Sequence, residues 1–129
     1  MKIIVRSKNI TPSEAIGDFI EEKIGGLKKF IDLLRKDGKI GKPTVKVFVE
    51  IEKETRHHKK GPYFRAEAQV YLSGRTLRVE AKGEDLKTAI VEVKNEMQQE
   101  IKKYKLRKID LEQRDARSIK NSKYPTSNN

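Results

Sequence analysis

The segment IKKYKLRK, residues 101–108, carries five basic side chains among its eight residues and no acidic one. Ammonium and guanidinium groups at this density bind phosphate oxygens through charge-assisted hydrogen bonds. Ile101 and Tyr104 lie three positions apart among them, which is the spacing of a buried stripe on a helix. The segment therefore predicts a helix end that is packed on one side and presents phosphate-binding cations on the other.

The whole chain is basic, which indicates a polyanionic partner. Its 129 residues include 30 Lys and Arg against 19 Asp and Glu, for a formal net charge of +11. Such an excess favours nucleic acid over an anionic membrane, and the alternative is a basic surface with no single partner. Charge and helical placement give these candidate phosphate contacts: Lys23, Lys28, Lys29, Lys94, Lys102, Lys103, Lys105, Arg107 and Lys108.

Residues 55–62, TRHHKKGP, form a second basic feature between two strand-like segments. Arg56, Lys59 and Lys60 are candidate contacts of a hairpin loop that touches phosphates, and the alternative is a solvated hairpin tip. The only two histidines, His57 and His58, are adjacent and point to opposite sides of an extended chain. No metal site is therefore expected.

No arrangement of a nucleophile and a base is visible in the sequence. The chain has no Cys, and Gly41-Lys42-Pro43 lacks the upstream Gly of a Walker-type phosphate loop. Glu50, Glu52 and Glu54 share one strand face, where they are better explained as partners of neighbouring cations than as an acid/base pair. We expect no enzyme activity, no cofactor and no small-molecule substrate.

No segment of this sequence is expected to span a membrane. It has no run of 18 apolar residues, and the apolar start of MKIIVRSKNI is interrupted by Arg6 and Lys8. Together with the absence of Cys, this favours a cytoplasmic protein.

Four segments alternate apolar and polar residues with the period of a β-strand, at residues 2–8, 44–54, 63–72 and 75–82. Each has one apolar face, so the sheet is predicted to be covered on one side only. The predicted inward residues of the last three strands are Val45, Val47, Val49, Ile51, Phe64, Ala66, Ala68, Val70, Leu72, Leu77, Val79 and Ala81.

Two segments have helical periodicity, from Pro12 to about Asp37 and from about Glu84 to Lys108. Thr11 is the expected cap of the first, and Gly25-Gly26 in its middle indicates either close approach to the sheet or a kink. The order β-α-β-β-β-α predicts a two-layer α+β domain over residues 1–108, with a four-stranded mixed sheet and both helices on one face. Residues 109–129 are polar and are predicted to form a flexible tail.

Double-stranded-RNA-binding domains share the α-β-β-β-α order and also place a Gly-Pro loop in a hairpin, as Gly61-Pro62 does here. Their lysine cluster, however, lies at the start of the last helix, where this chain has Glu84-Asp85. Aromatic residues make up only 6% of the chain, which disfavours stacking on single-stranded bases. Backbone phosphates are therefore the expected ligands.

The segment GEDLKTAIVEVKNEMQQEIKKYKLRK, residues 83–108, resembles the last helix of the ribosome hibernation-promoting factors, the family that includes ribosome-associated inhibitor A (protein Y). The N-terminal part is also similar, in the motifs at residues 9–12, 22–24 and 27–30, so the resemblance covers about residues 1–108. The chain departs from the family pattern at Lys87, Val91, Gln99 and Glu100.

This resemblance implies a protein that binds the small ribosomal subunit in the channel for mRNA and tRNA, contacts ribosomal RNA through basic helix residues, and holds ribosomes inactive during starvation or cold. It carries this role to Lys23, Lys29, Lys103, Lys105 and Arg107. The chain is expected to be a short form without the second, dimerising domain, and a monomer off the ribosome. The alternatives are a non-catalytic subunit of an RNA-processing or RNA-modifying enzyme, and a general double-stranded-RNA-binding module.

Overall fold

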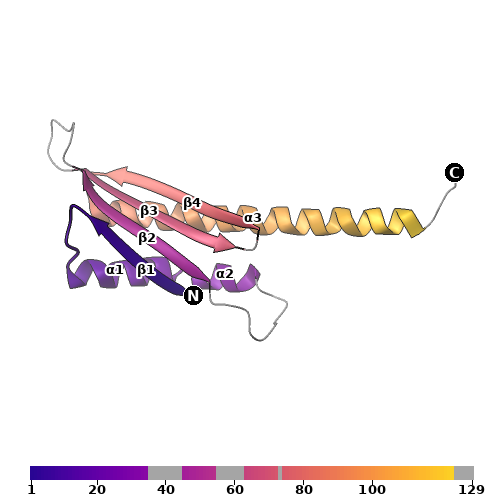
Figure 1. Ribbon diagram of the computed structural model, residues 1–129, viewed down its shortest axis with the longest axis horizontal. Coiled ribbons are helices and arrows are strands. Elements are labelled where there is room, and N and C mark those ends of the chain that lie inside the picture. Colours follow the sequence, from indigo (N-terminus) through magenta and orange to yellow (C-terminus); the bar gives the residue numbers. More distant parts are fainter. Residues whose placement is uncertain (35–44, 55–62, 73, 124–129) are drawn as a thin grey trace.

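The computed structural model describes residues 1–34, 45–54, 63–72 and 74–123, with side chains described as far as residue 116. The elements along the chain are β1 (Lys2–Lys8), α1 (Glu14–Gly25), α2 (Lys28–Leu34), β2 (Lys46–Glu54), β3 (Tyr63–Leu72), β4 (Arg75–Gly83) and α3 (Leu86–Lys123). Figure 1 shows the sheet lying over the helices, with α3 extending well past it.

The four strands form one mixed sheet in the order β1-β2-β3-β4. β1 runs parallel to β2, while the β2–β3 and β3–β4 pairs are antiparallel. The register aligns Ile3, Val47, Val70 and Leu77 in one row across the sheet. Because side chains alternate along each strand, this register gathers the apolar residues on one face, as the sequence predicts.

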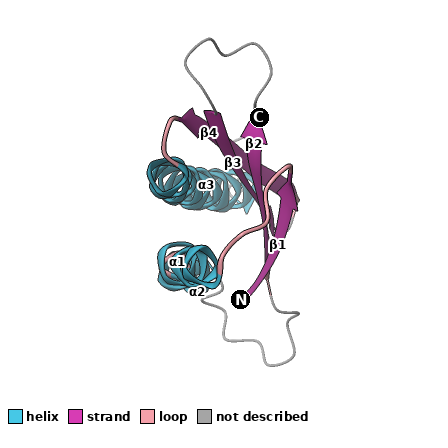
Figure 2. Cartoon of the chain, turned by 90° about the vertical axis from the view of Figure 1, so that its left-hand side faces the viewer, coloured by secondary structure: helices cyan, strands magenta, loops and turns pink. Residues whose placement is uncertain are grey.

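All three helices pack on that apolar face, so the prediction of a two-layer α+β domain is confirmed (Figure 2). Full burial of each large aliphatic side chain contributes about 1.5–3 kcal/mol. The core between the layers is made by Ile20, Ile24, Leu27, Ile31, Val47, Val49, Ile51, Ala66, Ala68, Val70, Leu77, Val79, Ala81, Leu86, Ala89, Ile90, Val93, Met97 and Ile101.

The first helical segment differs from its prediction at its start and in its middle. Ser13, not Thr11, caps α1, and its hydroxyl oxygen accepts a hydrogen bond from the backbone N–H of Ile16 at 3.2 Å. The helix then breaks after Gly25, where the backbone N–H of Leu27 donates to the carbonyl of Ile24, a bond that tightens the last turn. The predicted end near Asp37 lies outside the described residues.

The break, and not close approach to the sheet, accounts for the two glycines. A Cβ added at Gly25 would meet nothing within 4 Å. One added at Gly26 would lie 3.2 Å from the carbonyl oxygen of Lys23 and 3.6 Å from Cε of Lys94. Only Gly26 therefore stands at a close approach, and its tight neighbour is the Lys23 carbonyl of α1 itself, while Lys94 on α3 is at ordinary van der Waals distance.

α3 begins later and ends much later than predicted. Asp85 precedes it, and its carboxylate accepts hydrogen bonds from the Thr88 hydroxyl at 2.8 Å and the Thr88 backbone N–H at 3.3 Å. The Thr88 hydroxyl is the main reason that the pKa of Asp85 is lowered. The predicted end at Lys108 is wrong, because the helix continues to Lys123 and includes residues 109–123 of the predicted tail.

Candidate nucleic-acid interface

The outer face of the sheet, away from the helices, carries a dense network of ion pairs around Arg65. The guanidinium donates to Glu52 at 2.9 Å, to Glu67 at 2.9 Å, to Glu80 at 3.1 Å and also to Glu50. Burial of this side chain opposes its charge, but the hydrogen bonds that it donates to Glu52, Glu67 and Glu50 raise the pKa of Arg65. The glutamates predicted to pair with cations do so here.

Glu67 and Arg78 extend the same network. Arg78 donates to Glu67 at 2.7 Å, and this bond, with others from Gln69 and Arg65, lowers the pKa of Glu67 to about 2. Arg65 and Arg78, in the centre of the outer face, are therefore outnumbered by the carboxylates that pair with them. A polyanion would meet negative charge there, so this face is a poor candidate for RNA binding.

Among the described residues, the helix layer carries cations without carboxylate partners. Two of its pairs join residues within one helix, Lys28 with Asp32 at 2.9 Å and Lys103 with Glu100 at 3.5 Å. Within the part of the chain that the structure describes, no ion pair involves Lys23, Lys29, Lys87, Lys94, Lys102, Lys105, Arg107 or Lys108. This layer is the basic surface that the sequence predicts.

Many of these cations gather where α1 and α2 pack beside α3, a line that we call the interhelical seam. The residues that define it are Phe19, Lys23, Lys29, Phe30, Lys87, Lys94 and Lys102. At its α2 end, the half-buried Phe30 ring has Nζ of Lys29 5.2 Å and Nζ of Lys102 5.3 Å from its centre. The ring thus holds one cation from each side of the seam by cation–π attraction.

Phe19 repeats this arrangement at the α1 end. Nζ of Lys23 lies 5.6 Å and Nζ of Lys87 lies 5.5 Å from the centre of its ring. Between the two rings, Nζ of Lys94 donates to Gln98 at 2.8 Å. The seam therefore gathers ammonium groups from both sides, with two lysines over each aromatic ring.

Lys87 is a candidate contact that the sequence reasoning missed. In the sequence, Lys87 stands out only as a departure from the family pattern and not as a candidate phosphate contact. Its spacing of seven from Lys94 places both residues on one side of α3, which is the signal that identifies it.

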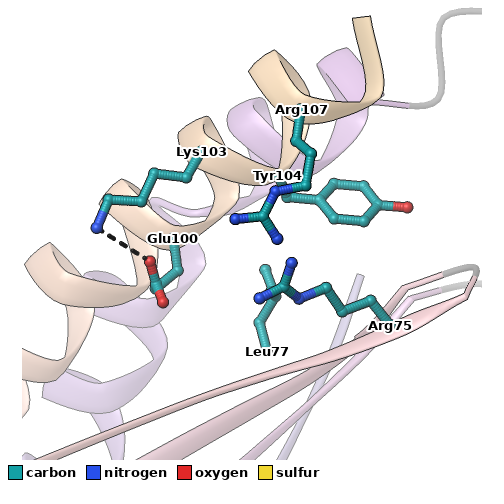
Figure 3. A pocket seen from close by; sticks show the side chains of 6 residues that line it. All are labelled: Arg75, Leu77, Glu100, Lys103, Tyr104 and Arg107. Carbon is teal, nitrogen blue, oxygen red and sulfur yellow. Dashed lines mark ion pairs between the residues drawn. The ribbon is translucent and has the colours of Figure 1, made fainter. Parts of the chain in front are cut away.

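Lys103 and Arg107 lie on a different flank of α3, facing β4. With Arg75, Leu77, Glu100 and Tyr104 they line a pocket of about 150 Å³ (Figure 3). The predicted site residues on α3 therefore divide into a seam group and a β4-facing group. Arg75, at the first position of β4, is a second residue that the sequence reasoning missed.

The remaining predicted contacts are not joined to either group by a described interaction. Lys28 and Lys108 are exposed, and Lys105 is half-buried. Arg56, Lys59 and Lys60 lie outside the described residues.

Metal sites and membrane-spanning helices are both absent from the described ranges. No group of three or more His, Asp or Glu side chains there could hold a metal ion, and His57 and His58 lie outside those ranges. No described helix is long and apolar enough to cross a membrane.

Comparisons with known proteins place this geometry in context. The model of the family described as Sigma 54 modulation protein / S30EA ribosomal protein matches residues 3–109. The Ribosome hibernation promotion factor of Staphylococcus aureus (strain COL) is 28% identical over 103 residues, which are 80% of this chain and 47% of that protein. The chain thus spans about half the length of this curated relative.

Two solved structures are similar over most of the chain. The N-terminal domain of Thermus thermophilus Protein Y is 25% identical, with a TM-score of 0.59 over 81% of this chain and 99% of that one. A ribosomal subunit interface protein from Coxiella burnetii is 15% identical, with a TM-score of 0.60 over 82% of this chain and 99% of that one. The second likeness supports the fold alone.

Proposed function

The chain belongs to the family described as Sigma 54 modulation protein / S30EA ribosomal protein, and from this premise we propose that it inhibits translation by binding the small ribosomal subunit. We propose the mRNA and tRNA channel as the binding site and ribosomal RNA as the main contact. The relative named as a ribosome hibernation promotion factor and the likeness to the Protein Y N-terminal domain support this proposal. Because the chain spans about half of the first of these, the proposal concerns the two-layer domain.

The observation that carries the proposal is the unequal charge of the two faces. The interhelical seam and residues 105–108 of α3 present cations without carboxylate partners among the described residues, whereas Arg65 on the outer sheet face is surrounded by glutamates. RNA walls present rows of phosphates, which attract the first surface and repel the carboxylates of the second.

The seam suits phosphate contacts better than base recognition. Phe19 and Phe30 are half-buried and each lies between two lysines, so their faces are occupied by ammonium groups. Bases stack on open aromatic faces, whereas fixed ammonium groups bind phosphates with little loss of conformational entropy. Inhibition then follows from occupancy, because a rigid domain that fills a channel excludes its other ligands.

We also propose that the protein is non-catalytic, needs no cofactor, acts in the cytoplasm and is monomeric off the ribosome. Its affinity should depend steeply on salt. With about six phosphate contacts, binding falls roughly a thousandfold between 50 and 200 mM salt.

Co-sedimentation with purified small ribosomal subunits tests the proposal. The chain should pellet with empty subunits and remain in the supernatant when mRNA and initiator tRNA already fill the channel. Binding that ignores channel occupancy would contradict the channel site. Equal competition by a plain RNA duplex would favour a general double-stranded-RNA-binding module instead.

A further inference from the structure

Arg75 of β4 and Arg107 of α3 extend their guanidinium groups toward one another across the pocket shown in Figure 3. Gly74 precedes Arg75 and has a φ of +79°, a value that glycine adopts without strain. β4 therefore starts directly after this turn, at the edge of the sheet, and its first side chain reaches α3.

The pocket holds more positive charge than its carboxylate can balance. Three cations, Arg75, Lys103 and Arg107, line it together with one carboxylate, Glu100. Glu100 pairs with Lys103 at 3.5 Å, and neither arginine has a carboxylate partner among the residues described. Two guanidinium groups that face each other without an anion repel, so the site favours a negatively charged ligand.

The shape and the donors fit a phosphate group. The pocket volume of about 150 Å³ is several times the ~30 Å³ that one water molecule occupies in the liquid. Guanidinium groups offer pairs of N–H donors in a planar fork that matches two oxygens of a phosphate. Leu77 closes the base of the pocket, which reduces competition from water on that side.

We propose that Arg75, Lys103 and Arg107 together bind one backbone phosphate of the RNA that the chain contacts, so that the interface extends from α3 onto β4. This inference rests on the proposed function and names one contact within it. The pocket is open, and the Lys103 side chain is 70% exposed. Such a site holds free phosphate weakly, whereas a phosphodiester is kept in place by its neighbours along the RNA.

The test measures binding of four variants to purified empty small subunits across 50–200 mM salt. The variants are Arg75→Gln, Arg107→Gln, the double substitution and Arg78→Gln. Arg78 lies on the same strand as Arg75 and loses the same charge when changed, but it faces the outer network beside Glu67. Thermal unfolding of each variant confirms that the domain is folded.

We expect Arg75→Gln to weaken binding about tenfold, because one charged hydrogen-bonding partner is lost, and to reduce the slope of log affinity against log salt by about 1. Arg78→Gln should bind like the unmodified chain. The losses from Arg75→Gln and Arg107→Gln should not add in the double variant, because both residues hold the same phosphate.

Three results would overturn the shared pocket: unchanged binding of Arg75→Gln, an equal loss in Arg78→Gln, or strict additivity in the double variant. Failure of the unmodified chain to bind small subunits is a separate result. It would overturn the proposed function and, with it, this inference.

Discussion

The ammonium group of Lys102 on α3 lies 5.3 Å from the centre of the Phe30 ring on α2, although 72 positions separate the two residues in the sequence. Lys29 lies over the same ring at 5.2 Å. Phe30 thus links the two helical segments of the basic face and fixes one cation from each. Phe19 has the same arrangement, with Lys23 and Lys87 over its ring, so the pattern of one ring and two lysines occurs twice along the interhelical seam.

Phe30→Leu should weaken ribosome binding about three- to tenfold, because two lysines lose an attraction of about 0.5–1 kcal/mol each that holds them in place. The free energy of unfolding should fall by about 1 kcal/mol, since leucine fills most of the half-buried site. Binding assays and urea denaturation measure the two effects. The control is Phe48→Leu, which removes a half-buried ring from the outer sheet face and should leave binding unchanged.

The two glycines at the helix break should respond differently to alanine. Gly25→Ala should raise the free energy of unfolding by about 0.5–1 kcal/mol, because the added Cβ meets open space and the unfolded chain loses freedom. Gly26→Ala should give less or none of this gain, since its Cβ would crowd a carbonyl oxygen at 3.2 Å. Chemical denaturation of both variants checks the order, and equal gains would show that the contact at Gly26 has no cost.

Stability should fall in acid through Glu67. Its pKa is lowered from 4.5 to about 2 in the folded state, chiefly by Arg78. A depressed carboxylate pKa stabilises the fold above the unfolded value, and this contribution is lost as the pH falls from about 4.5 to 2. Screening at the solvent-facing sheet limits it to the order of 2 kcal/mol.

Glu67→Gln isolates this contribution. The difference in free energy of unfolding between the unmodified chain and the variant should be largest above pH 5 and should shrink toward pH 2. A difference that stays constant across this range would assign the acid sensitivity to other carboxylates.

Reversal of Lys103, Lys105 and Arg107 to Glu should abolish ribosome binding and leave the fold in place. The change places negative charge in the middle of α3, where phosphates are the proposed ligands, while the side chains of Lys103 and Arg107 are exposed and that of Lys105 is half-buried. Co-sedimentation measures binding, and circular dichroism confirms the folded state. Unchanged co-sedimentation would remove these residues from the interface.

The strands of the sheet and the buried faces of the helices could be predicted from the sequence, because the apolar residues recur with periods of 2 and 3.6 residues. The row Ile3, Val47, Val70 and Leu77 also needs the register of the strands, because a shift of two residues would bury the same faces. The length of α3 was not predicted, because the apolar stripe ends at Tyr104 while the helix continues. Residues 106–117 contain no Gly or Pro, so local helix propensity extends the helix where packing no longer does.

The division of the basic residues into two groups also escaped prediction. It depends on which side chains of α1 and α2 lie against α3, and on the hairpin turn that brings Arg75 beside Arg107. These contacts join segments that are distant in the sequence. The positions of the charges along the chain do not show which basic residues become neighbours in the fold. The boundary at Lys108 between a ribosome-binding domain and a tail stays a prediction.

The central claim is that the helix layer, and not the outer sheet face, binds ribosomal RNA. Two double charge reversals of equal size test it most directly. Lys29→Glu with Lys102→Glu alters the seam, and Lys2→Glu with Lys46→Glu alters two exposed lysines that are paired across β1 and β2 on the outer face. Binding of both to empty small subunits should be lost in the seam variant and kept in the sheet variant. Equal binding by the two variants, or loss in the sheet variant alone, would contradict the account.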